Sequence, residues 1–246
     1  MTLWYKTWRE TRMRFLLSAS ILSWVCAVII LTNHGARGQA NPPIPYVEYV
    51  WQAVYKGYAQ DFFSILVIVL AGGSLLQERS HGTVGFTLAL PVSRTRLMAT
   101  RAVVGLSQVT VLAFLPACVL IGLSPVLGVF YPPMQALQFA VLWSAGGTII
   151  FAGALLLGTV VESEYSSWIA SFLCMMLYSA AVNITVLQRY PNLNFFKMMS
   201  GAQMPYLDAV TFTIHGPLPW AIITTVLVTA VFLMALANRL TQLRDY

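Results

Sequence analysis

Long apolar runs separated by short polar segments fill the sequence from residue 15 to residue 238. Most of these runs approach the ~20 residues that a helix needs to cross the hydrocarbon core of a bilayer. The pattern predicts six membrane-spanning helices, near residues 15–31, 55–76, 102–123, 136–161, 167–187 and 218–238. The continuously apolar part of the second, Phe62 to Leu76, is short, so this helix must include the turns before it.

The segments between the runs carry their own patterns. Residues 3–14 place Trp4 and Trp8 one helical turn apart, which predicts an amphipathic helix lying in the headgroup region; a simple positive anchor for the first span is the alternative. Residues 32–54 contain a proline-rich run and are predicted to form an external loop. A second external segment covers 188–217, in which 195–207 either re-enters the outer leaflet or lies on it.

Composition supports a membrane protein. Of 246 residues, 58% are hydrophobic and only 9% are charged, whereas roughly a quarter of the residues of a soluble domain are charged. The expected fold is therefore all-α and polytopic, with a single membrane domain over residues 1–246 and no room for a soluble one. The first apolar run is long for a cleavable signal peptide, so we expect it to remain as the first span.

The net charge of +6 is explained by topology rather than by a nucleic-acid partner. If the N-terminus is cytoplasmic, six spans leave ten of the 14 Lys and Arg residues on the cytoplasmic side, as the positive-inside rule requires. Both termini are then cytoplasmic, and we expect the protein in the plasma (inner) membrane. Cys26, Cys118 and Cys174 lie on three separate spans, so neither a disulfide framework nor a metal site is predicted.

The most distinctive polar segment is residues 78–101, between the second and third spans. Gly82 permits a turn away from the bilayer, and apolar residues at helical spacing follow up to Pro91. Ser93 is a good N-cap for a new helix that leads into the third span. An ordinary positive loop with a proline turn would also collect arginines, but this combination of features is rarer and favours a short coupling helix.

This segment resembles that of the membrane subunits of ABC-2-type transporters, which belong to the ATP-binding-cassette exporters. The resemblance rests on Glu-Arg-x-x-Gly-Thr at residues 78–83, followed by Leu-Pro-Val-Ser-Arg at residues 90–94. The predicted plan of an interfacial N-terminal helix, six spans and an external segment before the sixth is also similar. The absence of cysteines from that external segment fits a bacterial or archaeal source.

The resemblance implies a separate ATPase subunit, which would bind ATP and Mg, and a second permease copy or a related permease. It implies that the coupling helix contacts the ATPase. The residues carried over to this contact are Glu78, Arg79, His81, Gly82, Thr83, Leu88, Pro91, Val92, Ser93, Arg94 and Arg96.

Two further groups of residues are candidates. Glu162 and Glu164 lie in a predicted cytoplasmic turn, where they either cap the fifth span or make a secondary ATPase contact. Polar or amphipathic residues within the spans could line a substrate path, although most such residues only hold helices together. These residues are Gln108, Ser144, Thr148, Tyr178 and Asn183.

The motifs that the sequence lacks narrow the function. It has no phosphate-binding G-x-x-x-x-G-K-[ST] loop and no catalytic constellation, so no enzyme activity is predicted for this chain. No Asp, Glu, Lys or Arg falls in the core of a span, which argues against an ion-coupled carrier. We therefore expect a permease subunit for an amphipathic or lipid-like substrate. The subunit itself is expected to contact membrane lipid. A non-transporting scaffold or immunity-type protein is the alternative, ahead of an ion-coupled secondary transporter.

Overall fold

The computed structural model describes most of the chain as helices. The described residues are 2–39, 44–72, 94–161, 163–184, 194–202, 207–208, 212–214 and 216–243. The helices longer than 14 residues are α1 (Thr2–Gln39), α3 (Tyr58–Gly72), α6 (Arg94–Leu123), α7 (Pro133–Val160), α8 (Glu164–Val182) and α10 (Trp220–Leu243). The short ones are α2 (Tyr46–Val50), a π-helical turn (Trp51–Tyr55), a 3₁₀ turn (Pro125–Leu127) and α9 (Phe195–Met199). The described residues form no named strand, only an isolated bridge between Leu207 and Ile214.

Six helical segments are long and apolar enough to cross a membrane, which confirms the all-α polytopic fold. Proline or serine precedes or opens several of them, as expected for residues that tolerate the first turn of a helix or cap it. Pro45 precedes α2, Pro133 opens α7, and the Ser163 hydroxyl accepts a hydrogen bond from the Ser166 N–H at the start of α8.

Two boundaries differ from the sequence prediction. Residues 3–14 are the first turns of α1, which continues without interruption into the first span. The loop predicted over 32–54 is also shorter, because α1 extends to Gln39 and the second span begins at Tyr46. The last proline of the run, Pro45, directly precedes α2, a position at which a helix tolerates proline.

The second span consists of two helical pieces. The π-helical turn Trp51–Tyr55 joins α2, and the chain bends at Lys56 and Gly57 before α3 begins. The Lys56 ammonium lies 5.0 Å from the centre of the Trp51 ring, a cation–π distance. The continuous helix predicted over 55–76 is therefore interrupted near its start.

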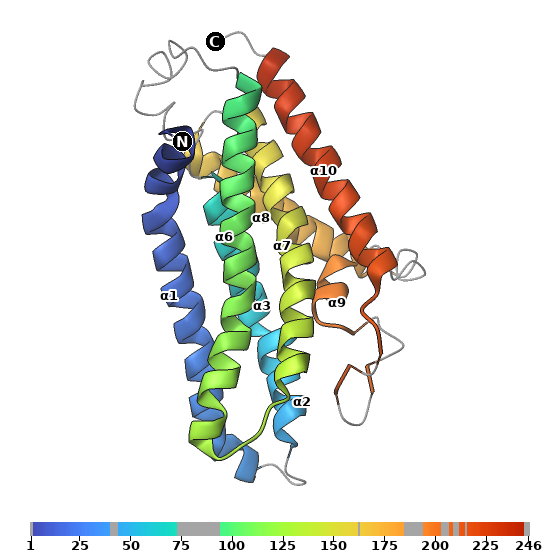
Figure 1. The fold of residues 1–246 in the computed structure, drawn as a ribbon. Helices are drawn as coiled ribbons and strands as arrows, with labels where there is room; N and C mark the ends of the chain where they lie inside the picture. The colour runs from blue at the N-terminus through green and yellow to red at the C-terminus, as the bar shows by residue number, and fades with distance from the viewer. Residues whose placement is uncertain are drawn as a thin grey trace.

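Helix α7 is the centre of the bundle and packs on α3, α6, α8, α9 and α10 (Figure 1). Two glycines allow this close packing. A Cβ atom at Gly147 would lie 2.7 Å from Val109 Cγ1 of α6 and 2.8 Å from Phe63 Cζ of α3, and one at Gly146 would lie 2.3 Å from Met199 Sδ of α9. The absence of side chains at these positions brings three neighbouring elements against one helix.

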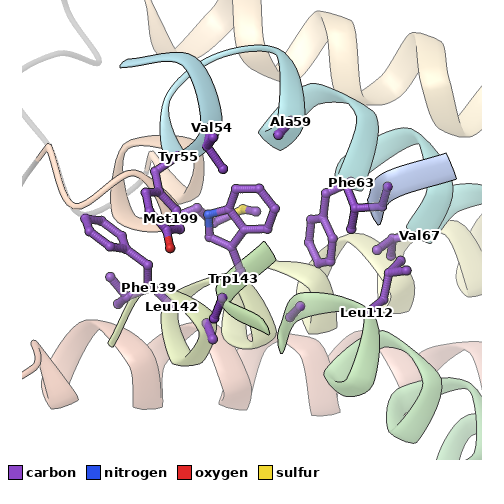
Figure 2. Packing of buried hydrophobic residues seen from close by; sticks show 14 of the residues in the cluster. Val54, Tyr55, Ala59, Phe63, Val67, Leu112, Phe139, Leu142, Trp143 and Met199 are labelled. Carbon is purple, nitrogen blue, oxygen red and sulfur yellow. The ribbon is translucent and has the colours of Figure 1, made fainter. Parts of the chain in front are cut away.

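An aromatic cluster fills the core beside α7 (Figure 2). Tyr55 stacks on Phe139 with ring centroids 4.0 Å apart, and Phe63 lies 4.9 Å from Trp143. All four side chains are fully buried. Offset-stacked and tilted rings are the favoured geometries for aromatic pairs, so the cluster fixes the second span against α7.

Both ends of the described chain lie at one end of the bundle. Figure 1 shows the N-terminal end of α1, the start of α6 and the C-terminal end of α10 at the top, with α2 at the bottom. The Gln242 Nε2 of α10 donates a hydrogen bond of 2.8 Å to Thr95 Oγ1 of α6. The start of the third span is thus tied to the end of the sixth.

Candidate functional site

Most of the segment predicted to hold the coupling helix lies outside the described residues, which resume at Arg94. Glu78, Arg79, His81, Gly82, Thr83, Leu88, Pro91, Val92 and Ser93 lie outside the described residues. Helix α6 begins at Arg94, as the sequence predicts, and Arg96 is exposed in its first turn. The segment therefore leads into the third span at the end of the bundle where α1 starts and α10 finishes (Figure 1).

Of the acidic pair in the turn between α7 and α8, Glu162 lies outside the described residues, and only the backbone of Glu164, the first residue of α8, is described. The hydroxyl of Ser163, between them, is the N-cap. The serine therefore makes the capping hydrogen bond that the structure describes at this end of α8. An ATPase contact by either glutamate stays a prediction.

A cation lies close to the first turns of α8. The Arg14 guanidinium carbon of α1 is 5.7 Å from the centre of the Trp168 ring, within cation–π range. The indole packs tightly on α3, where a Cβ atom at Gly72 would overlap Trp168. This contact joins α1, α3 and α8 at the end of the bundle that the charge distribution predicts to be cytoplasmic.

The candidate path residues do not converge on one passage. Gln108 Nε2 donates to Thr11 Oγ1 at 2.7 Å, in a buried contact between α6 and α1. The Ser144 hydroxyl lies 3.4 Å from that of Thr110 between α7 and α6, and Thr148 donates to the Ser144 carbonyl. Hydrogen bonding between and within helices accounts for these side chains, as it does for most polar residues in membrane spans.

Asn183 and Tyr178 of α8 occupy different environments. Asn183 caps the C-terminal end of the helix, where its side chain donates to the Ser179 carbonyl and is exposed. Tyr178 is half-buried and stacks on Phe195 of α9, with ring centroids 4.7 Å apart. Of the five candidates, Tyr178 alone lines the cavity described next.

A cavity of about 460 Å³ lies between α7, α8 and α10. Its wall is largely aliphatic and includes Ile149, Ile150 and Leu157 of α7, Met175 of α8, and Val226 and Leu233 of α10. The hydroxyls of Thr225 and Thr229 also line it, but each donates to the carbonyl four residues earlier in α10. The wall therefore offers few polar groups to a guest.

Two further cavity residues are Gly153, which the sequence does not single out, and Phe195, which it places only in the predicted external stretch 195–207. A Cβ atom at Gly153 would have no neighbour within 4 Å, so this glycine leaves open space in the wall. Phe195 belongs to α9, which was predicted either to lie on the membrane or to re-enter it. The structure packs α9 on α7, with Met198 and Met199 almost fully buried. Whether residues 195–207 lie on the membrane or re-enter it stays a prediction.

In the described part of the chain, no group of three or more His, Cys, Asp or Glu residues could hold a metal ion. In comparisons with known proteins, no family model and no curated protein matches the chain.

Proposed function

We propose that this chain is the membrane-spanning permease subunit of an ABC exporter, which moves an amphipathic or lipid-like substrate with ATP hydrolysed by a separate ATPase subunit. The observation that carries the proposal is the pair of motifs at residues 78–83 and 90–94, placed between the second and third of six apolar helices. The apolar cavity beside α7 is consistent with such a substrate.

The proposed mechanism is a rigid-body one. Residues 78–94 contact an ATPase subunit, and ATP-driven closure of two ATPases displaces two such segments. The displacement reaches α6 directly, because this helix begins at Arg94. It also reaches α10, because Gln242 is bonded to Thr95 in the first turn of α6. Two helices that are far apart in the sequence would therefore move together.

Affinity purification from native membranes tests the proposal. The tagged chain is isolated in mild detergent, and its partners are identified by mass spectrometry. We expect a stoichiometric partner with a phosphate-binding loop, which is lost from the triple variant Leu88→Pro, Arg94→Glu, Arg96→Glu. The control is Arg239→Glu, which reverses an exposed charge near the same end of the bundle but outside the segment. The control should retain the partner.

Other outcomes would redirect the interpretation. A chain that purifies alone, or with partners that bind no nucleotide, would favour the scaffold or immunity-type alternative. Substrate movement that follows a proton or sodium gradient in vesicles, without any need for ATP, would favour an ion-coupled carrier.

A further inference from the structure

We infer that the cavity between α7, α8 and α10 is a binding site for one acyl chain of a membrane lipid, which enters laterally between α8 and α10. The inference does not depend on the proposed coupling to an ATPase, because it concerns a site in the chain alone.

The wall of the cavity determines the chemistry of the guest. Aliphatic and aromatic side chains dominate it, and the threonine hydroxyls are occupied within their own helix. Apolar cavities in proteins remain free of water and accept apolar guests. A volume of about 460 Å³ also falls within the ~300–1,000 Å³ typical of small-molecule sites. A polar or ionic ligand would find little to replace its hydration shell.

The position of the cavity determines where the guest comes from. Cys174 of α8 and Thr225 and Thr229 of α10 line the cavity and are also exposed, so the cavity reaches the surface between these helices. That surface is strongly apolar: Leu177 is 70% exposed and Val228 is 68% exposed. In a membrane-spanning bundle such a surface faces hydrocarbon, so acyl chains rather than water lie at the opening.

The size of the cavity favours a lipid acyl chain over a helix of a second copy as its occupant. Its wall on α10 runs from Thr225 to Leu233, which is about 12 Å at a rise of 1.5 Å per residue. A helix of a second copy is about 10 Å wide and would need a groove along most of its length. The stacked rings of Tyr178 and Phe195 lie in the wall beside α9 and limit how far a guest can extend in that direction.

Photo-crosslinking tests the inference with the full chain in phosphatidylcholine nanodiscs. The probe is a phosphatidylcholine with a diazirine in one acyl chain, and adducts are mapped by mass spectrometry. We expect adducts to concentrate on peptides covering 149–157, 171–178 and 225–233, above those on exposed positions of α1. Adducts spread evenly over all lipid-exposed helices would overturn the inference.

Filling the cavity provides the decisive variants. Gly153→Phe should lower the adducts on these peptides about tenfold, because the new ring takes the apolar surface that binds the chain. Gly122→Phe is the matched control, since Gly122 of α6 also has no atom within 4 Å of a Cβ position but lies outside the cavity. Thr229→Phe fills the cavity from α10 and serves if Gly153→Phe does not elute as a monodisperse protein.

The remaining outcomes are also informative. Unchanged adducts in both filled variants, or an equal loss in Gly122→Phe, would contradict the site. Efficient crosslinking of Cys174 between two copies by a short bis-maleimide would assign the surface to a second copy instead. A free fatty acid carrying the same diazirine distinguishes a site for lipid acyl chains from one that takes only the free acid, and selective labelling by the free acid alone would overturn the lipid assignment.

Discussion

At the scale of single residues, the glycines of α7 have opposite roles. Gly147 contacts Val109 and Phe63, which belong to two neighbouring helices, whereas Gly153 borders open space. The sequence shows both as glycines in an apolar run and contains nothing that distinguishes them. The difference depends on which residues of α3 and α6 lie opposite, and that is set only when the bundle is assembled.

Leucine substitutions at these two positions should therefore differ in sign or size. Gly147→Leu forces a side chain between two packed helices and should destabilise the protein by about 1–3 kcal/mol, the usual effect of overpacking. Gly153→Leu on the same helix should be neutral or stabilising, since leucine also has the higher helix propensity. The midpoint of thermal unfolding in detergent measures the stability of each variant against the unchanged protein. Equal midpoints for the two variants would contradict the packing described for α7.

At the scale of elements, the internal packing of α9 could not be predicted. Its backbone accepts hydrogen bonds from helices distant in sequence: Trp51 Nε1 donates to the Ser200 carbonyl at 2.7 Å, and Gln60 Nε2 donates to the Phe196 carbonyl at 2.9 Å. Hydrophobic periodicity identifies long spans well, because each must be apolar over ~20 residues. A helix of five residues held by side chains more than 130 positions away leaves no such pattern.

Removal of one of these donors should loosen α9 specifically. Gln60→Leu removes the side-chain donor of the Phe196 carbonyl, which keeps only the hydrogen bond from the Ser200 N–H. The loss of one such hydrogen bond costs about 0.5–1.5 kcal/mol. Hydrogen–deuterium exchange should become faster in peptides covering 194–202 and stay unchanged in α6. Gln52→Leu is the control, because the exposed Gln52 side chain donates to Glu48, four residues earlier in the same span, and not to α9. Faster exchange throughout the protein would indicate general destabilisation instead.

At the scale of the whole molecule, the order of the spans was predictable, whereas the pairing of polar side chains across the bundle was not. Gln108 and Ser144 are candidates for a substrate path because they are polar within apolar helices, although most such residues only hold helices together. The structure places them at contacts of α6 with α1 and with α7. A single sequence gives the polarity of such residues, but their partners depend on how the helices are arranged around α7.

The arrangement predicts that the two ends of the bundle face opposite sides of the membrane. Arg239→Cys and Val126→Cys, each in a background with Cys118 and Cys174 replaced by serine, should react with a membrane-impermeant maleimide from opposite sides. The charge distribution predicts the cytoplasmic side for position 239, and Val126 lies in the turn that follows α6 at the other end. Labelling of both from one side would contradict a six-span bundle. Reversed labelling would retain the bundle and invert its orientation.

The two ends of the described chain lie at the same end of the bundle, which allows two copies to be fused and only one of them to be changed. Because α1 starts and α10 finishes at the same end of the bundle, a short linker can join two copies head to tail without crossing the bilayer (Figure 1). Such a tandem polypeptide would permit a change at Arg96 in one half only. If a permease acts as a pair, this design would show whether one intact contact is enough to drive both halves.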